Sequence, residues 1–437
     1  LNAELVHDIG MAIGSESRDH GEDTICVARD GRLSGPSLHQ ALIEGLMASG
    51  CKVKDCGMVP TPVLYFATHT TGATSGVMLT GSHNPKDHNG LKIVIGNSSL
   101  TGDAIMRLYW RIRMGDIKKG AGECEKIDVL DAYYNYICKD IKLDRPLKVV
   151  VDAGNGVGGV TAQPLLEKLG AKVIPLCCEV DGNFPVHHPD PSKEANLVLL
   201  KEAMEEHQAD IGFALDGDAD RLGIVTPKGE VIWPDRQLMF FAQAILAKNP
   251  GKTVIYDVKC SAHVEKIIEA AKGEPLMYKT GHSLVKTKMK AINAIFAGEM
   301  SGHLFFNDRW FGFDDGMYTA ARMLEILASG DQDADTLFDA IPNSHCTPEL
   351  NVAIAEEKKF TYIEELIAKM DFPQTQKITI DGVRVQWQDG WALVRASNTT
   401  ANLVVRFEAD SAVVLKRIMS DMRQLMQDVD SSLSLDF

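Results

Sequence analysis

The sequence predicts an α/β protein of four domains around a central cleft: three related mixed α/β domains and a C-terminal α+β domain. The chain has 437 residues, several times the roughly 150 residues of an average domain. Three stretches repeat one order of apolar strands and helix-period segments, and four polar loops each lie between two closely spaced apolar strands. The C-terminal stretch has a different order of elements, so we expect it to form a domain of another type.

Each repeat begins with an apolar strand, continues through a helix-period segment and ends in a second apolar strand. This order is typical of parallel βαβ units, whose sheets are covered on both faces. The strand, helix and strand segments are 24–28, 42–47 and 53 in the first repeat, 147–151, 164–166 and 173–174 in the second, and 253–256, 264–268 and 275–278 in the third.

The four polar loops follow the apolar strands 76–79, 212–215, 295–297 and 392–394; they read TGSHNPKDHNG, DGDADR, GEMSGH and RASNTTAN. Because binding sites form at strand ends and domain junctions, we expect all four loops to face one cleft. In the last domain, helices at 360–370 and 413–426 are expected to flank strands at 377–385 and 392–407. The predicted domains are 1–126, 127–231, 232–343 and 344–437.

Composition narrows the function. The chain is 45% hydrophobic and 24% charged, as folded globular proteins are, and its net charge of -15 argues against nucleic acid or an anionic membrane as a partner. It contains no apolar run of membrane-spanning length and no basic leader, so we expect a cytoplasmic protein. Nine cysteines without CxxC spacing are expected to be reduced thiols.

Ser82 lies in the first loop, directly after an apolar strand. Gly81 permits a tight turn before it, and Pro85 prevents a helix from continuing, so the hydroxyl is expected at a strand end. An ordinary turn that satisfies its own backbone is the alternative.

The second loop carries three aspartates, Asp216, Asp218 and Asp220, separated by small residues. In an extended loop alternate side chains point the same way, so the carboxylates can converge. Three such charges beside an apolar strand repel one another unless a cation neutralises them, and hard oxygen ligands suit Mg²⁺. Arg221 follows at once, either as a fixed cation for a phosphoryl group or as an ion-pair partner of these aspartates.

The third and fourth loops carry groups that suit a phosphorylated sugar. Glu299 and Ser301 alternate, which places a carboxylate and a hydroxyl on one side of the chain for sugar hydroxyls. The fourth loop gathers a guanidinium, hydroxyls and an amide that can hold a phosphate: Arg395, Ser397, Asn398 and Thr399.

Together the four loops resemble those of the α-D-phosphohexomutase family, in particular its bacterial phosphomannomutase/phosphoglucomutase branch. The similarity extends from about Ile9 to Phe437 in the family's order and includes VARDGRLSGP, MVPTPV, EVDGNFPVHHPDP, DVKC, KTGHSL, RWFGFDDG and VDSSL. The resemblance implies three related α/β domains and a fourth of TBP-like form. It also implies an enzyme that moves a phosphoryl group between positions 1 and 6 of a hexose phosphate, with glucose 1,6-bisphosphate as intermediate and activator. We expect the protein to be a monomer.

The resemblance further implies roles for individual residues. Ser82 would be the phosphoserine and, with the three aspartates, would hold Mg²⁺. Lys92 and His303 would transfer protons, and Arg221 and Lys259 would line the cleft. The sugar would be read by Glu299 and Ser301 with His282 nearby, and the distal phosphate would be held by Arg395, Ser397, Asn398 and Thr399.

Two features depart from the family pattern. The family opens with a strand ending in a Tyr-Asp-Ile-Arg-Gly type segment, which is missing here, so we expect the chain to start inside the family's first domain. Ala219 stands where glycine is common, and a methyl group should be tolerated unless the residue needs a positive φ.

Other functions stay open at this point. Residues 154–159 fit GxGxxG, with Glu179 about 20 residues on, as in dinucleotide-dependent oxidoreductases, although Asp152 would repel a pyrophosphate. Asp216 could instead be the nucleophile of an aspartyl phosphatase. A phosphoglucosamine mutase and a sugar-phosphate sensor without turnover are the remaining alternatives.

Overall fold

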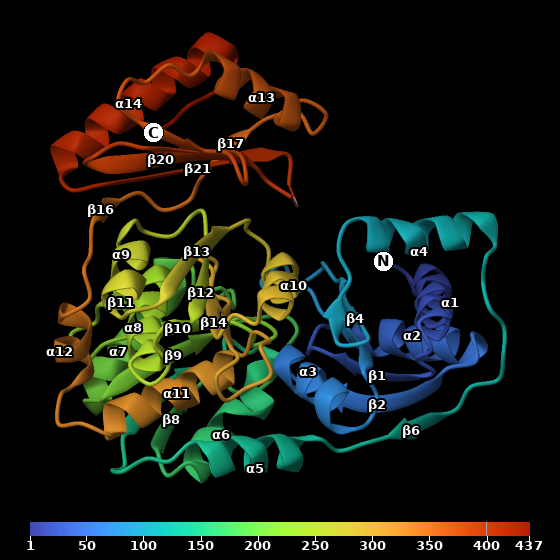
Figure 1. Ribbon diagram of the computed structural model, residues 1–437. Helices are drawn as coiled ribbons and strands as arrows, with labels where there is room; N and C mark the ends of the chain where they lie inside the picture. The colour runs from blue at the N-terminus through green and yellow to red at the C-terminus, as the bar shows by residue number, and fades with distance from the viewer. Residues whose placement is uncertain (399) are drawn as a thin grey trace. The chain divides into compact units, whose positions relative to one another are not determined.

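A computed structural model describes residues 1–398 and 400–437 (Figure 1). Thr399, predicted to bind phosphate, lies outside the described residues. The chain forms two compact units. The first unit contains Leu1–Pro234, His282–Ala297 and Ser301–Ala340, and the second contains Asp235–Gly281, Gly298–Met300 and Ile341–Phe437. The predicted third domain, 232–343, is thus divided between the two units.

The first sheet has six strands in the order β5-β4-β3-β1-β2-β6. β1 is parallel to β2 and β3, so the predicted βαβ unit is present. The strand after the first polar loop, β4, pairs antiparallel with β3 before it. Apolar residues of α1 and α2 pack on the sheet. The elements are α1 (Ala3–Asp19), β1 (Thr24–Arg29), α2 (Gly35–Ala48), β2 (Lys52–Met58), α3 (Thr61–Thr70), β3 (Ser75–Leu79), β4 (Leu91–Ile95), β5 (Ser98–Ser99), α4 (Asp103–Met114) and β6 (Cys124–Lys126).

The second sheet repeats this plan in the order β11-β10-β9-β7-β8. β7 is parallel to β8 and β9, and β10 is antiparallel to β9. The carboxyl ends of β7, β8 and β9 therefore lie at one edge, where sites tend to form. The elements from α5 on are α5 (Leu130–Asp140), β7 (Lys148–Asp152), η1 (Val157–Val160), α6 (Ala162–Lys168), β8 (Lys172–Leu176), η2 (Glu194–Leu197), α7 (Val198–His207), β9 (Ile211–Leu215), β10 (Leu222–Val225) and β11 (Val231–Ile232).

The third region contains the last predicted βαβ repeat. β12 is parallel to β13, with α9 between them along the chain. The elements are α8 (Pro234–Leu246), β12 (Thr253–Asp257), α9 (His263–Ala270), β13 (Glu274–Tyr278), α10 (His282–Ile292), β14 (Phe296–Gly298), β15 (Leu304–Phe306), α11 (Gly316–Ala328) and α12 (Ala334–Asp339). These bounds agree with the predicted strands to within a residue or two.

The C-terminal region is an antiparallel sheet with α13 and α14 on one face (Figure 1). The single strand predicted at 377–385 is wrong: a turn with Gly382 at a φ of 67° breaks it into two strands. β20 is buried along its whole length. The elements are β16 (His345–Cys346), β17 (Leu350–Ala353), α13 (Lys359–Lys369), β18 (Gln376–Ile378), β19 (Val383–Gln386), β20 (Gly390–Ala396), β21 (Asn402–Ala409) and α14 (Ala412–Val429).

Within the described part of the chain, no helix is both long and apolar enough to cross a bilayer. All nine cysteines are free in the structure.

Candidate active site

Ser82 lies three residues beyond the end of β3, in a left-handed backbone conformation with a φ of 47°. Such a conformation is uncommon for a residue with a side chain and is often found at functional sites. The Ser82 amide donates to Thr80 Oγ1 over 2.8 Å, and the Ser82 hydroxyl donates to Asp216 Oδ2 over 2.8 Å. The structure thus joins the first predicted loop directly to the second.

Arg32, to which the sequence analysis gave no role, holds the Ser82 loop in shape. Its side chain is almost fully buried and pairs with Asp30 at 3.1 Å. The guanidinium donates to four backbone carbonyls of the loop, those of Ser82, Asn84, Pro85 and His88, at 2.5 to 2.8 Å. Asp30 in turn accepts hydrogen bonds from Thr80 Oγ1 and the Gly81 amide. This fork of donors explains why so exposed a loop keeps a defined conformation.

The three aspartates of the second loop converge, although the loop is a turn and not the extended segment that the sequence analysis assumed: the Ala219 amide donates to the Asp216 carbonyl over 3.0 Å. One carboxylate oxygen from each lies within 4.8 Å of the others, and all three side chains are buried. The Lys92 ammonium bridges two of them, 2.7 Å from Asp218 and in contact with Asp220. Thr61, which the sequence analysis did not select, donates its hydroxyl to Asp218. In this arrangement Lys92 supplies part of the positive charge that the carboxylates need.

Ala219, in the middle of the aspartate loop, has a φ of 60°. The sequence analysis expected its methyl group to be tolerated unless a positive φ was required, and the structure shows that it is required. The loop therefore accommodates alanine in a conformation that favours glycine.

The loop suits a divalent cation. Within the described chain, the buried oxygens Asp218 Oδ1 and Asp220 Oδ1 accept no hydrogen bond. A buried carboxylate oxygen without a partner is costly, and carboxylates with a serine oxygen are the hard ligands that Mg²⁺ prefers. The residues present therefore fit a hard metal ion held by Ser82, Asp216, Asp218 and Asp220.

Arg221 packs against the same loop. Its Nε and Nη2 atoms each donate to Asp216 Oδ2 over 3.0 Å, and its Nη1 atom donates to the Ser301 carbonyl over 3.3 Å. Burial raises the pKa of Asp216 to about 7 although the Arg221 charge opposes this rise. The third predicted loop thus meets the second through Arg221, and its contact there is the backbone of Ser301.

His303 and His282 lie together at Asp314, another residue that the sequence analysis did not select. His303 Nδ1 is 2.9 Å and His282 Nδ1 is 3.4 Å from Asp314 Oδ2, and the two rings stack at 5.1 Å. Lys286 donates to Asp314 Oδ1 over 2.9 Å. Burial lowers the pKa of His282 to about 4, so its ring is neutral near pH 7. His303 Nδ1 is also 3.6 Å from Asp220, which joins this cluster to the aspartate loop.

The other predicted residues belong to the second unit. Lys259 is buried and lies 2.6 Å from Glu349 Oε1. Glu299 is buried and accepts from the Gly281 amide. Arg395 donates to Asp381 Oδ2 over 3.0 Å, and the Ser397 hydroxyl accepts from Thr400 Oγ1 over 2.8 Å. Asn398 is exposed.

The C-terminal sheet holds the backbone around Lys259. Arg384, stacked 3.9 Å above the Trp391 ring, donates to the carbonyls of Val258 and Cys260 at 2.8 and 2.7 Å. Arg406 donates to the Lys259 carbonyl. Glu408 accepts from the Ser261 hydroxyl over 2.9 Å. Sequence patterns could not reveal these contacts, because they join strands to a loop far away along the chain.

Four family models match the chain in order. They describe phosphoglucomutase/phosphomannomutase alpha/beta/alpha domain I at residues 1–113, domain II at 131–229, domain III at 233–345 and the C-terminal domain at 349–425.

Individual relatives agree with these models. A phosphomannomutase/phosphoglucomutase from Pseudomonas aeruginosa is 52% identical over 100% of this chain and 94% of its own length. A phosphoglucomutase from Neisseria gonorrhoeae is 48% identical over 98% of this chain and 94% of its own. The crystal structure of a phosphoglucomutase/phosphomannomutase family protein from Burkholderia thailandensis matches with a TM-score of 0.95 and 48% identity, over 100% of this chain and 96% of that one.

Proposed function

The chain belongs to the phosphoglucomutase/phosphomannomutase family, and we propose that it moves a phosphoryl group reversibly between positions 1 and 6 of a hexose phosphate, with Ser82 as the carrier. The observation that carries this proposal is the 2.8 Å contact between the Ser82 hydroxyl and Asp216, at a buried triad of aspartates. A serine, three carboxylates and the Arg221 cation in one place are what phosphoryl transfer requires, because that reaction depends on positioning and charge neutralisation.

Phosphorylated Ser82 would give its group to the free hydroxyl of the sugar monophosphate and form a 1,6-bisphosphate. After the bisphosphate reorients in the site, so that its other phosphate faces Ser82, Ser82 would take back that phosphoryl group. Glucose 1,6-bisphosphate is accordingly proposed as intermediate and activator. Mg²⁺, held by Ser82 and the three aspartates, would supply charge neutralisation for the transferred phosphoryl group.

The chain's own side chains would do the rest of the chemistry. Arg221 would neutralise phosphoryl oxygens, since its guanidinium already lies on the metal-binding loop. Lys92 and His303 are the proposed proton-transfer groups: both contact Asp220, Lys92 through its ammonium and His303 at 3.6 Å. The Asp314 carboxylate, 2.9 Å from His303, would hold the imidazole in a fixed orientation.

The remaining predicted residues would bind the substrate. Glu299 and Ser301 with His282 would read sugar hydroxyls, Lys259 would line the cleft, and the fourth loop would hold the phosphate that does not react. That loop contributes Arg395, Ser397, Asn398 and Thr399. The proposed roles of the domains follow: phosphoserine for 1–126, metal for 127–231, sugar for 232–343 and phosphate for 344–437.

Mannose and glucose phosphates are the proposed substrates, because curated relatives carry the names phosphomannomutase/phosphoglucomutase and phosphoglucomutase. Phosphoglucosamine mutase activity is the alternative that a substrate panel would reveal. A dinucleotide-dependent oxidoreductase is not favoured: Asp152 Oδ1 already accepts from the Gly154 amide over 2.8 Å, within the glycine-rich loop that would have to bind a pyrophosphate. A cytoplasmic monomer remains the prediction for location and assembly.

Replacing Ser82 with alanine tests the proposal. Purified protein is assayed with glucose 1-phosphate and with mannose 1-phosphate, each with a trace of glucose 1,6-bisphosphate. Since Ser82→Ala removes the carrier itself, we expect turnover to fall by more than the hundredfold typical of losing one transition-state contact. Thermal unfolding should be unchanged. Ser37→Ala, at an exposed serine of α2, is the matched control and should keep full activity.

The phosphoenzyme gives a second measurement. An acid-stable phosphoprotein that disappears in Ser82→Ala supports the proposal. A phosphoprotein cleaved by hydroxylamine would instead identify Asp216 as the nucleophile and contradict it.

A further inference from the structure

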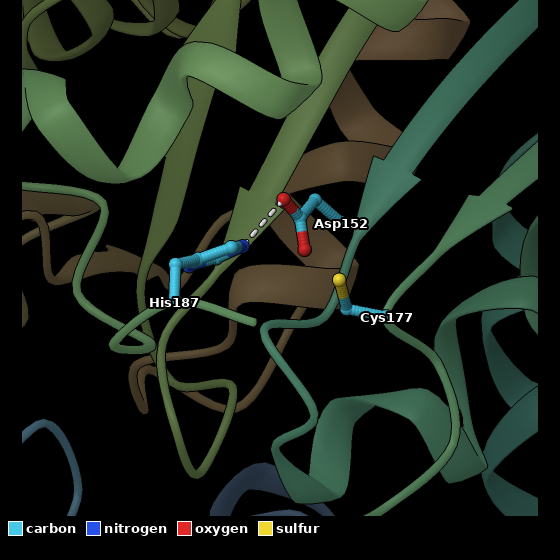
Figure 2. A group of neighbouring side chains, drawn as sticks. All are labelled: Asp152, Cys177 and His187. Atoms are coloured by element: carbon cyan, nitrogen blue, oxygen red, sulfur yellow. Dashed lines mark hydrogen bonds and ion pairs between the residues drawn. The ribbon is translucent and has the colours of Figure 1, made fainter. Parts of the chain in front are cut away.

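A second group of metal-ligating side chains lies outside the proposed active site, at the carboxyl ends of β7 and β8. Asp152 ends β7, Cys177 follows β8, and His187 comes from the loop that continues toward η2. One potential ligand atom from each residue lies within 4.8 Å of the others. Figure 2 shows the three side chains converging, Asp152 from the end of β7, Cys177 from the turn after β8 and His187 from a loop. The proposed mutase chemistry uses none of them.

The His187 ring is fixed on both sides. Its Nδ1 atom lies 3.1 Å from the His188 carbonyl, and its Nε2 atom lies 2.9 Å from Asp152 Oδ2. A carbonyl oxygen can only accept, so Nδ1 must carry a hydrogen at this contact. A backbone carbonyl that fixes one nitrogen in this way is the usual outer partner of a metal-bound histidine.

The hydrogen on Nδ1 determines which interactions His187 Nε2 can make with Asp152. With Nδ1 protonated, a neutral ring presents the lone pair of Nε2 to a carboxylate oxygen, and two acceptors do not attract each other across 2.9 Å. Something positive must occupy the contact, either a second ring proton or a metal ion. Asp152 is fully buried, and its other oxygen is already committed to the Gly154 amide. One carboxylate oxygen therefore remains for the cation.

Cys177 supplies the third ligand. It adopts a φ of 48°, and its carbonyl accepts from the Asn155 amide over 2.8 Å, so the turn that presents the thiol is fixed by the backbone. The neighbouring thiol of Cys178 instead lies 3.4 Å from the Leu176 carbonyl. Only the first cysteine of the pair therefore belongs to the group.

We propose that Asp152, Cys177 and His187 form a binding site for a divalent transition metal of the Zn²⁺ class, with a fourth position open to water. A thiolate, an imidazole and a carboxylate form a ligand set that Zn²⁺ accepts, and a thiolate disfavours Mg²⁺ and Ca²⁺. Two ligands on a tetrahedral Zn²⁺ lie about 3.4 Å apart, so the His187–Asp152 contact would widen by roughly half an ångström on binding. As the sulfur–metal bond forms, the thiol S–H bond breaks and its proton passes to solvent.

Such a metal would fix the loop that carries His187 to the ends of two buried strands. The same loop reaches the Ser82 loop, because the ring of His188 hydrogen-bonds to the His83 carbonyl over 2.5 Å. The site would therefore stabilise a segment next to the proposed phosphoserine without touching the reacting groups.

Cobalt(II) is the probe that distinguishes this site from the aspartate triad. The full-length protein, stripped with a chelator and returned to excess Mg²⁺, is titrated with Co²⁺ while the near-ultraviolet sulfur-to-cobalt charge-transfer band is recorded. Only a cysteine ligand produces this band, so the triad cannot contribute to it. We expect the band in the native protein, its displacement there by competing Zn²⁺, and its loss in Cys177→Ser. Direct calorimetric titration with Zn²⁺ in excess Mg²⁺ should show binding at least tenfold weaker in that variant.

Cys178→Ser is the matched control and should keep the band, and His187→Gln should weaken binding without removing either thiol. The hydrogen bond to Asp152 raises the pKa of His187, so an imidazolium–carboxylate pair is the competing explanation. Absence of the band in the native protein, or its persistence in Cys177→Ser, would overturn the proposal and leave the imidazolium–carboxylate pair as the explanation of the His187–Asp152 contact. Mutase activity in Mg²⁺ is measured in parallel, so this site and the proposed function can fail separately.

Discussion

Single residues determine the conformation of the loops at the candidate site. Arg32 contributes most, because it holds the Ser82 loop. Its guanidinium supplies hydrogen bonds to four carbonyls that have no helix or sheet to pair with. A lysine has three donors on one atom and cannot reproduce the planar fork.

For Arg32→Lys we expect the free energy of unfolding to fall by at least about 2 kcal/mol, because a hydrogen bond to a charged group contributes about 1.5 to 3 kcal/mol and lysine would lose at least one of the four. Turnover should fall with it as the Ser82 loop loses its conformation. Urea unfolding and steady-state kinetics check both effects. Arg113→Lys, at an exposed position of α4, should change neither, and an Arg32→Lys protein as stable and active as the parent would refute the role assigned to Arg32.

For a substitution at Ala219 we expect a gain in the free energy of unfolding, not a loss. Glycine removes a left-handed strain of roughly 1 to 2 kcal/mol, and the lost methyl group costs about 0.8 kcal/mol of burial. We therefore expect Ala219→Gly to raise the free energy of unfolding by up to about 1 kcal/mol, with the mutase activity kept. Thermal and urea unfolding measure it, and a clear destabilisation would show that the loop prefers the methyl group.

At the scale of residues, the sequence predicted the site residues that stand together in short motifs. Ser82 and the three aspartates stand in short contiguous motifs beside apolar strands, so their grouping was predictable. The roles of Arg32, Thr61 and Asp314 were not, because each depends on partners that folding brings in from distant segments.

At the scale of elements, α1 and α4 are joined by one buried carboxylate. Glu16 on α1 accepts from Arg107 Nε at 3.1 Å and from Arg111 Nε at 2.8 Å. Burial raises the pKa of Glu16, but the hydrogen bonds and charges of Arg111 and Arg107 lower it by more, so the net pKa lies below its ordinary value.

A pKa that is lower in the folded state than in the unfolded chain fixes the direction in which stability changes with pH. The ionised Glu16 stabilises the folded state above the pKa of the unfolded chain, and this stability is lost as the pH falls through the folded pKa. For Glu16→Gln we expect a loss of about 1 to 3 kcal/mol at pH 7, which shrinks at acid pH because the parent then loses the same interaction. Unfolding curves at several pH values measure this. An equal loss at every pH would mean that charge is not involved.

The order of elements was predictable, and their edges were less so. Hydrophobic periodicity located most of the predicted strands of the three α/β regions to within one or two residues. The predicted helix segment 42–47 covers only part of α2 (Gly35–Ala48), and helices such as α3 and α7 were not predicted. The prediction failed at 377–385 because the predicted strand was continued through Asp381-Gly382, a turn pair at which the alternation changes register. The apolar residues lie at even positions before this pair and at odd positions after it, so the sequence did carry a signal for the turn.

At the scale of the molecule, the fold class and the family resemblance are both confirmed. Repetition made this possible, because three copies of one pattern are harder to produce by chance than one. The division into two compact units could not be predicted, since it depends on how segments such as α10 and α11 pack away from their neighbours in sequence.

Removal of divalent metal should affect function and spare the fold. Lys92 and Arg221 already pair with the three aspartates, so the carboxylates are held together without an ion. We expect a chelator to abolish turnover and Mg²⁺ to restore it, while the circular dichroism spectrum and the midpoint of thermal unfolding stay within error. Unfolding on chelation would show that these two cations are insufficient to hold the loop.

Arg384, Arg406 and Glu408 hydrogen-bond to the backbone at residues 258–262, so the C-terminal sheet is joined to the segment that carries Lys259 within the second unit. Lys259 and Arg395, both proposed to bind substrate, would therefore move together as parts of one rigid body. A ligand phosphate bound by Arg395 would displace Lys259 with it, and the distance between the two cations would stay constant throughout the proposed catalytic cycle.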